Sequence, residues 1–366
     1  MKIKEQKNLF LMHVLGTLIN NNMGYYDEKE KENTFKLREL LSTLPPFCKD
    51  FFRSIEPRTT SRTRLAYAYD LHVFFNFLSE KNPSFKDKIE LSDIDKITFL
   101  DIEEYMEYLK YYKNPDELEK SNSVSGIKRK IATLRSFYKY YYNNDLIKNN
   151  PAAKITLPKL RDNDIIRLDV NEVVDLIDTV ESGHELTDKE EIYHKKLSIR
   201  DLAIISLMLG TGIRVSECVG INLSDIDMKN TAIRIKRKGA KTATIFFSDE
   251  VKIYLEKYIS ERQKIENVDE KSEDALFLSM QKKRISVRAV EKLVKKYAGK
   301  VTPLKHITPH KLRSTFGTNL YEETDDIYLV ASVLGHNDVN TTKKHYAALE
   351  DNKKRLSRNI VKLKEQ

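Results

Sequence analysis

Apolar residues recur at helical spacing over most of the chain and alternate at strand spacing in one short stretch. Within residues 8–19, Leu11, Leu15 and Leu18 fall on one side of a helix. We expect this N-terminal helix to pack against protein, and our hypothesis is another subunit in an assembly, rather than to bind DNA. Residues 1–56 are therefore predicted to form a helical extension.

Residues 57–152 keep the helical period throughout and are predicted to form one helical domain. Two apolar rows define it, one in the segment RTRLAYAYDLHVFFNFL and one in VSGIKRKIATLRSFYKYYYNND. The first row is Leu65, Tyr69, His72, Phe75 and Leu78, and the second is Ile127, Ile131, Leu134 and Tyr138. Asn-Asn-Pro at residues 149–151 ends the pattern.

Residues 153–167 show no helical period and are predicted to be an extended linker. Beyond them, Asp169 is placed to cap a helix that reaches Val180. A second helix is predicted to begin near Ser198 and to be broken by Gly210-Thr-Gly212.

Strand-like alternation appears over residues 231–247, where TAIRIKR, the turn KGAK and TATIFF predict a β-hairpin. Helical spacing resumes after it. Residues 168–350 are thus predicted to form a domain of helices around one small antiparallel sheet, followed by a basic tail over residues 351–366. The predicted fold class is mostly α with a small antiparallel β-sheet.

Length and charge narrow the class of protein. At 366 residues the chain is long enough for two domains with separate cores. Its 64 Lys and Arg against 55 Asp and Glu give a net charge of +9, which favours a polyanionic partner without establishing one. Only +1 of this charge lies in the first 50 residues, so the extension is not predicted to be a DNA-binding arm.

The two cysteines, Cys48 and Cys218, have no Cys-x-x-Cys or Cys/His spacing around them. This favours a reducing compartment and argues against a zinc site, so we predict no metal and no cofactor. The apolar run over residues 8–19 includes His13 and is too short to span a bilayer. The predicted location is the cytoplasm, with no membrane partner.

Residues suited to holding a phosphate stand near a predicted helix start. Thr308 and Pro309 suit the cap and the first position of a helix. His310 and Arg313 then share one face, close to free N–H groups that favour an anion. The structural alternative is a capped surface helix with an incidental His and Arg.

Arg214 follows a turn with two glycines, where a helix start can aim its guanidinium rigidly. Two arginines suit a phosphodiester, because each donates paired hydrogen bonds and neither loses its charge. Taken alone, Arg214 is more often an ion-pair partner, here of Glu217 or Asp225.

The segment LGHNDVNTTKKHYA, residues 334–347, holds the remaining candidates. Gly335 is predicted to close a helix, and His336 follows it. Tyr346, ten residues later, is either a buried aromatic of a short helix or a nucleophile, and the segment alone does not decide.

In order, the motifs TGIRVSE, RKGAK, HKLR and LGH with a tyrosine ten residues on resemble the tyrosine recombinase/integrase family of phage and transposon integrases, Xer and Cre. The resemblance covers about residues 165–350. It implies a SAM-like core-binding domain over residues 57–152 and a catalytic domain over residues 168–350. It also implies a site-specific recombinase, an integrase or transposase of a mobile genetic element. Such an enzyme works as a homo-tetramer on two double-stranded DNA sites, with accessory proteins as potential partners.

The resemblance also implies roles for individual residues. Arg214 and Arg313 would clamp the scissile phosphate, and Tyr346 would form a 3′-phosphotyrosyl bond. Lys238 would be the general acid for the departing 5′-hydroxyl. The two assisting histidines would be His310 and His336.

Two of these assignments leave alternatives open. Lys236 and Lys241 are close enough to Lys238 to compete for the role of general acid. Many family members have nine residues rather than ten between the last histidine and the tyrosine. The residue at that position here is His345, which cannot replace a phenol.

Basic residues off the apolar row of the second helix, together with lysines of the hairpin, are predicted to contact the DNA backbone. They are Lys128, Arg129, Lys130, Arg135, Lys236 and Lys241. The alternative is a solvated basic face on an ordinary bundle. Two rival functions also remain: a type IB topoisomerase, which relaxes DNA of any sequence, and a DNA-binding regulator whose motifs are vestigial.

Overall fold

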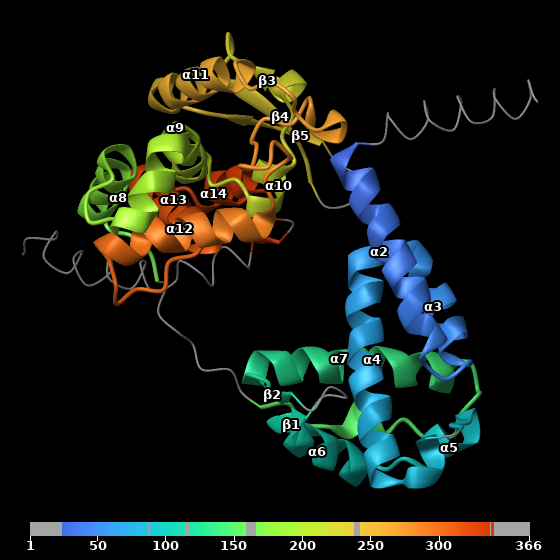
Figure 1. Cartoon of the computed structure of the whole chain (residues 1–366). Helices are drawn as coiled ribbons and strands as arrows, with labels where there is room; N and C mark the ends of the chain where they lie inside the picture. Colours follow the sequence, from blue (N-terminus) through green and yellow to red (C-terminus); the bar gives the residue numbers. More distant parts are fainter. Residues whose placement is uncertain are drawn as a thin grey trace, which may run out of the picture. The chain divides into compact units, whose positions relative to one another are not determined.

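The computed structural model divides the chain into two compact units, residues 1–162 and residues 163–366 (Figure 1). The residues that it describes are 24–86, 88–113, 118–158, 166–237, 242–336, 338 and 339. The predicted helix over residues 8–19 and the basic tail over residues 351–366 lie outside these ranges.

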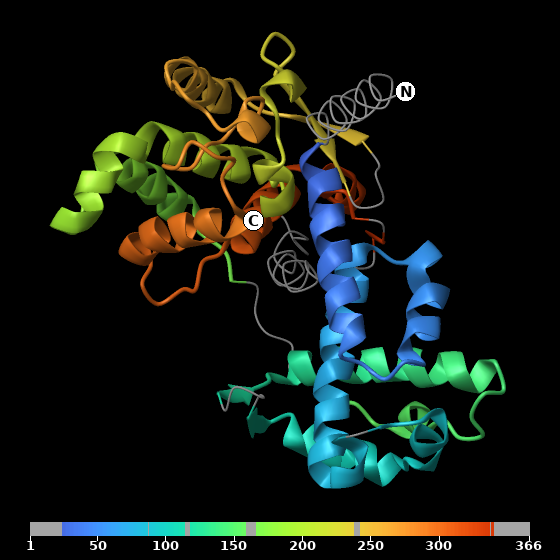
Figure 2. The ribbon, with the colours of Figure 1, turned by 45° about the vertical axis from the view of Figure 1, so that its right-hand side comes forward.

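The first unit is built mainly from helices. They are α2 (Tyr25–Ser42), α3 (Cys48–Ile55), α4 (Ser61–Lys81), α5 (Leu91–Lys96), α6 (Phe99–Tyr108) and α7 (Val124–Asn143), with short 3-10 turns η1 (Glu56–Arg58), η2 (Pro83–Lys86) and η3 (Pro151–Lys154). Figures 1 and 2 both show α2 alongside α4 and α7 running across α4. Thr60 and Ser123 cap α4 and α7 by accepting backbone N–H groups of the first turn.

The apolar row predicted on α7 is confirmed, because Ile127, Ile131, Leu134 and Tyr138 are all buried. The row predicted on α4 is wrong in part. Tyr69 is 53% exposed, whereas the nearby Leu71 and Phe74 are fully buried. Because α4 packs against α2 as well as α7, its buried surface is wider than one stripe.

The described part of the predicted extension packs into the core of the first unit. Phe51 and Ile55 of α3 are buried in the same cluster as the core residues of α4 and α7. The Phe47 ring lies 6.1 Å from that of Phe75 and 6.4 Å from that of Phe137, measured between centroids. The boundary predicted at residue 56 therefore does not coincide with an edge of this core.

A short hairpin interrupts the helices of the first unit. Strands β1 (Tyr111–Lys113) and β2 (Glu119–Ser121) pair antiparallel, with Tyr111 opposite Ser121. The expectation of helices throughout residues 57–152 is wrong here, because strands of three residues are too short to show an alternating pattern.

The second unit surrounds a small sheet with helices. The helices are α8 (Val170–Ser182), α9 (Asp188–Thr211), α10 (Val215–Val219), α11 (Asp249–Gln263), α12 (Val287–Val301), α13 (Pro309–Thr324) and α14 (Ile327–Leu334), with 3-10 turns η4 (Leu223–Asp225) and η5 (Glu270–Ser272). The sheet has the order β3 (Ile226–Asp227), β4 (Ala232–Lys236) and β5 (Thr242–Phe246), all antiparallel. The predicted hairpin is confirmed, with β3 as an additional strand, and so is the mostly α fold class.

Helix boundaries in the second unit follow local capping signals. Asp169 caps α8 as predicted, in a capping box with Glu172. The following helix, α9, begins ten residues before the predicted Ser198, because Thr187 forms a capping box with Glu190 there. It ends as predicted at Gly212, which adopts the left-handed conformation that favours glycine.

Candidate active site

Helix α13 carries two of the predicted site residues and begins where the sequence indicated. Thr308 is the N-cap residue and Pro309 the first helical residue. Arg313 is almost completely buried, although it is charged. The hydroxyl of Thr315 accepts a hydrogen bond of 3.0 Å from the backbone N–H of Leu168, which joins α13 to the chain just before α8.

Helix α14 ends at Gly335, in the left-handed conformation with φ +63°. The backbone N–H of Gly335 donates to Ser332 O (3.0 Å) and that of His336 to Ala331 O (2.9 Å), which is the Schellman pattern of helix termination. This arrangement leaves the carbonyl groups of residues 333–335 without intrahelical donors.

Two arginines from distant segments donate to two of these carbonyls. Arg313 donates from Nη2 to Leu334 O, and from Nη1 to Gly212 O at 2.6 Å. Arg214, at the start of α10, donates from Nη2 to Gly335 O at 3.1 Å. The structure therefore brings Arg214 and Arg313 together at the end of α14, immediately before His336.

The charges at this point do not balance. Buried Glu217 accepts from Arg214 Nη1 at 2.8 Å and from the Arg214 backbone N–H at 3.0 Å. Of the two ion-pair partners predicted for Arg214, Glu217 is therefore confirmed. Asp225 pairs with Arg234 instead. Carbonyl dipoles hold a cation without cancelling its charge, so the contacts named here, two guanidiniums with one carboxylate, suit an anion.

His310 lies one helical turn before Arg313 and is exposed. Partial loss of water around its ring, followed by the positive charges of Arg313, Lys311 and Arg214, lowers the pKa of His310 below its usual value near 6.5. The imidazole is therefore neutral at pH 7 and able to accept a proton.

His336 is half-buried directly after Gly335. Lys236 is exposed at the last position of β4. Three further predicted residues, Lys238, Lys241 and Tyr346, lie outside the described residues. The catalytic roles of all these residues stay predictions.

Comparison with protein families decides what kind of protein carries this site. The model described as "Phage integrase family" matches residues 166–353, and that described as "Phage integrase SAM-like domain" matches residues 43–157. This chain belongs to the phage integrase family. It is a tyrosine recombinase, an enzyme of site-specific DNA recombination.

Relatives in other organisms agree over nearly the whole chain. The recombinase is 36% identical over 338 residues to tyrosine recombinase XerC of Caldanaerobacter subterraneus subsp. tengcongensis, covering 87% of each chain. It is 31% identical over 351 residues to tyrosine recombinase XerS of Streptococcus thermophilus, covering 89% of this chain and 98% of that one.

Solved structures share the fold. One is XerH bound to a palindromic difH substrate after cleavage, with TM-score 0.61 and 18% identity over 87% of this chain and 85% of that one. Another is the Tn1549 transposon integrase with transposon right end DNA, with TM-score 0.59 and 19% identity over 86% of this chain and 99% of that one.

The four basic residues predicted on α7 of the recombinase differ in their surroundings. Arg129 forms an ion pair of 2.6 Å with buried Asp70. Lys130 is itself buried and donates to Asn122 at 2.8 Å. Arg135 donates to two backbone carbonyls of the first unit, whereas half-buried Lys128 makes no such bond within the described part of the chain. Sequence spacing alone did not separate the internal contacts of Lys130 and Arg135 from DNA contacts.

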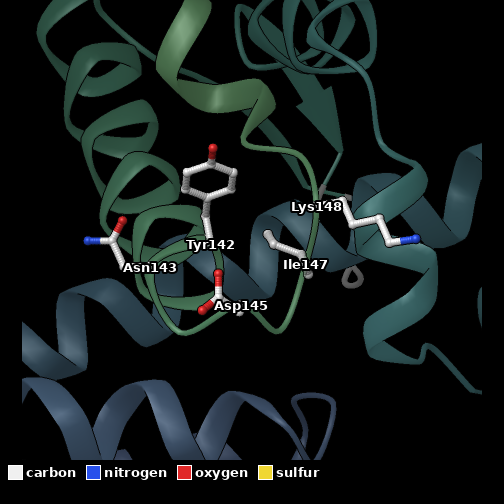
Figure 3. A pocket seen from close by; sticks show the side chains of 5 residues that line it. All are labelled: Tyr142, Asn143, Asp145, Ile147 and Lys148. Atoms are coloured by element: carbon white, nitrogen blue, oxygen red, sulfur yellow. The ribbon is translucent and has the colours of Figure 1, made fainter.

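An open depression lies at the end of α7, lined by Tyr142, Asn143, Asp145, Ile147 and Lys148 (Figure 3). Figure 3 shows the Lys148 side chain turned away from the others. The depression belongs to the first unit, whereas the arginines of the candidate active site belong to the second. Within the described ranges, no group of three or more His, Cys, Asp or Glu residues could hold a metal, and no helix is long and apolar enough to cross a membrane.

One residue at the site was not predicted from the sequence. Arg237, directly after β4, donates from Nη2 to Val333 O at 3.0 Å. Its position beside the predicted general acid Lys238 gave no signal for this contact, because the partner lies 96 residues away.

Proposed function

We propose that this recombinase cleaves and rejoins double-stranded DNA at a specific site through a 3′-phosphotyrosyl intermediate on Tyr346. The observation that carries the proposal is the meeting of Arg214 and Arg313 on the adjacent carbonyls of Gly335 and Leu334. Two guanidiniums fixed on adjacent carbonyls, one of them also paired with buried Glu217, are suited to the two non-bridging oxygens of a phosphodiester.

In the first step, the Tyr346 oxygen attacks the scissile phosphorus and the bond to the 5′-oxygen breaks. The phenol needs a group to take its proton, because its usual pKa is near 10. Neutral His310 is suited to that role. The leaving 5′-oxygen takes a proton from Lys238 and departs as a hydroxyl.

The extra negative charge of the pentacovalent phosphorane is stabilised by Arg214 and Arg313. Attack by a 5′-hydroxyl of a second strand then reverses the same step, releases Tyr346 and returns the proton to Lys238. One phosphate ester replaces another throughout, so strand exchange proceeds without an external energy source.

The test is a single-turnover reaction on DNA flanking the protein's own gene, nicked so that the short fragment carrying the freed 5′-hydroxyl diffuses away. After a detergent quench, peptide mass spectrometry locates any covalent link. We expect the adduct on Tyr346 and its absence from Tyr346→Phe. Tyr328→Phe is a matched control, because Tyr328 is an exposed tyrosine on α14. An adduct on a different residue contradicts the assignment of Tyr346.

The same assay separates the rival functions. Relaxation of DNA regardless of sequence, without joining of exchanged strands, indicates a type IB topoisomerase. Tight binding with no adduct on any DNA indicates a regulator. We infer that the partner is DNA carrying a specific site. A homo-tetramer would bind two such sites in the cytoplasm. Accessory proteins can be added to the reaction to test whether they are needed.

The biological setting has two candidates. The sequence reading favoured the integrase or transposase of a mobile element. The relatives at 31–36% identity carry Xer names instead, which favours an Xer-type recombinase that joins two copies of one site. Recombination between two identical sites on one plasmid supports the Xer type. A requirement for two different sites, one from each end of an element, supports the mobile element.

A further inference from the structure

Arg237 reaches from the small sheet to the end of α14. It follows Lys236, the last residue of β4, and donates from Nη2 to Val333 O at 3.0 Å. The side chain thus connects two segments that are far apart in sequence. It links the sheet directly to the corner at the end of α14, residues 333–336.

The Arg237 guanidinium also lies against the bare Cα of Gly335. A Cβ added to Gly335 would stand 2.0 Å from Arg237 Nη1 and 2.4 Å from its Cζ. Such contacts do not occur between real atoms, so any larger residue at 335 would displace Arg237. Glycine is needed at this position for its positive φ and for this close approach.

With Arg237 included, three successive carbonyls of the corner each accept from a different arginine. Val333 O accepts from Arg237, Leu334 O from Arg313, and Gly335 O from Arg214. The proposed function asks Arg214 and Arg313 to direct donors at a phosphate, which competes with their bonds to the corner. Arg237 has no such task and can hold the corner throughout.

We propose that Arg237 is a positioning residue for strand cleavage. It fixes the corner at residues 333–336 from the sheet side while Arg214 and Arg313 engage the phosphate. Because the guanidinium is directed at Val333 and Gly335, it acts through the corner and not on DNA. The part of this proposal that concerns cleavage rests on the proposed function.

The first test does not depend on cleavage. Hydrogen exchange is measured on the full-length protein, for the amides of Gly335 and His336 that close α14. Arg237→Ala should speed their exchange by about tenfold or more, as for the loss of one charge-assisted hydrogen bond. Arg234→Ala is the matched control, because Arg234 lies on β4, three residues before Arg237, with its side chain 64% exposed. Equal exchange in Arg237→Ala and wild type overturns the proposal.

The second test uses the single-turnover cleavage assay. Arg237→Ala should slow adduct formation about tenfold with unchanged DNA affinity, and Arg237→Lys should recover part of the rate. Gly335→Ala should slow cleavage more in the wild-type background than in Arg237→Ala, where no guanidinium remains to be displaced. Strictly additive effects, or a normal cleavage rate in Arg237→Ala, overturn the role in positioning. If wild type forms no adduct, the proposed function fails, and hydrogen exchange still decides whether Arg237 holds the corner.

Discussion

A buried cation in each unit, Lys130 in the first and Arg313 in the second, is held in a different way. In the first unit, buried Asp70 on α4 accepts from Arg129 at 2.6 Å and from Thr133 at 2.8 Å, with Lys130 Nζ at 3.9 Å. In the second unit, Arg313 is as buried as Lys130, yet its two hydrogen bonds named above go to backbone carbonyls.

The difference concerns the neighbour of the buried cation. Buried Lys130 has a carboxylate 3.9 Å away, which offsets part of its charge, so the Asp70 cluster joins α4 to α7 without a ligand. Carbonyl oxygens orient a guanidinium and leave its charge available. The same type of side chain therefore serves packing in one unit and is ready for a phosphate in the other.

The largest expected effect comes from the second unit. Arg313→Lys should lower the single-turnover cleavage rate by about 10²–10³-fold, as for the loss of one fixed donor to a transition-state oxyanion. Lysine keeps the charge but cannot hold two carbonyls in fixed directions.

Arg262→Lys is the matched control for this substitution. Arg262 is equally buried and also donates to backbone carbonyls, those of Ser272 and Glu273. Both variants should lose stability, but only Arg313→Lys should lose cleavage out of proportion to the folded fraction. Equal losses of cleavage in the two variants would erase the distinction between the two kinds of arginine.

In the first unit, Asp70→Asn should affect stability and spare chemistry. Removing the carboxylate charge leaves buried Lys130 without the opposite charge of Asp70. We expect this to lower the free energy of unfolding by on the order of 3 kcal/mol. Hydrogen exchange of α4 and α7 peptides in urea measures this loss. Asp50→Asn, in the exposed ion pair with Arg53, should cost about 0.5 kcal/mol or less. Cleavage by folded Asp70→Asn that falls as far as in Arg313→Lys would contradict the comparison.

His310 should show its surroundings in the pH dependence of cleavage. Because its pKa is lowered, the neutral form persists to lower pH than for an ordinary histidine. Cleavage at limiting protein concentration reports groups of the free protein and should fall only as pH drops below about 6.5. His310→Asn should slow cleavage by about 10²-fold and abolish this acid limb, the fall in cleavage rate at low pH. Substitution of exposed His184 by Asn should leave both the rate and the acid limb unchanged. A limb centred above the usual histidine pKa would contradict the role of His310.

The smallest effects should separate the basic residues of α7. Lys128→Ala should weaken DNA binding about equally for all sequences and lower the salt dependence by about one counterion. Arg135→Ala should instead destabilise the first unit by about 1–2 kcal/mol, because the carbonyls of Ala152 and Ile155 lose their donor. Titrations at several salt concentrations measure the first effect and urea unfolding measures the second. A full loss of one counterion in Arg135→Ala would place it on the DNA surface after all.

Local signals in the sequence were enough to predict each helix end at the site. Thr308-Pro309 indicated the start of α13, and Gly212 and Gly335 indicated the ends of α9 and α14. These signals act over a few residues, which is why they can be read without a fold.

The contacts between those ends could not be predicted in the same way. Arg214 donates to a residue 121 positions away and Arg313 to one 101 positions away, and no local pattern encodes such a pairing. The link through Arg237 was missed for this reason. The packing of α3 into the core of the first unit was also not predicted. In this case the local sequence held the signal, because Phe51 and Phe52 are adjacent apolar residues.

The bonds at the end of α14 form a closed cycle along the chain: Gly212 to Arg313, Arg313 to Leu334, and Gly335 back to Arg214, two residues from Gly212. During synthesis, both arginines leave the ribosome before the carbonyls of Leu334 and Gly335 that orient them. A nascent chain that ends before residue 334 therefore has its phosphate-binding side chains but lacks the means to fix them. Closing so long a loop comes late in folding, so the two arginines take up their fixed directions only when the rest of the unit is in place.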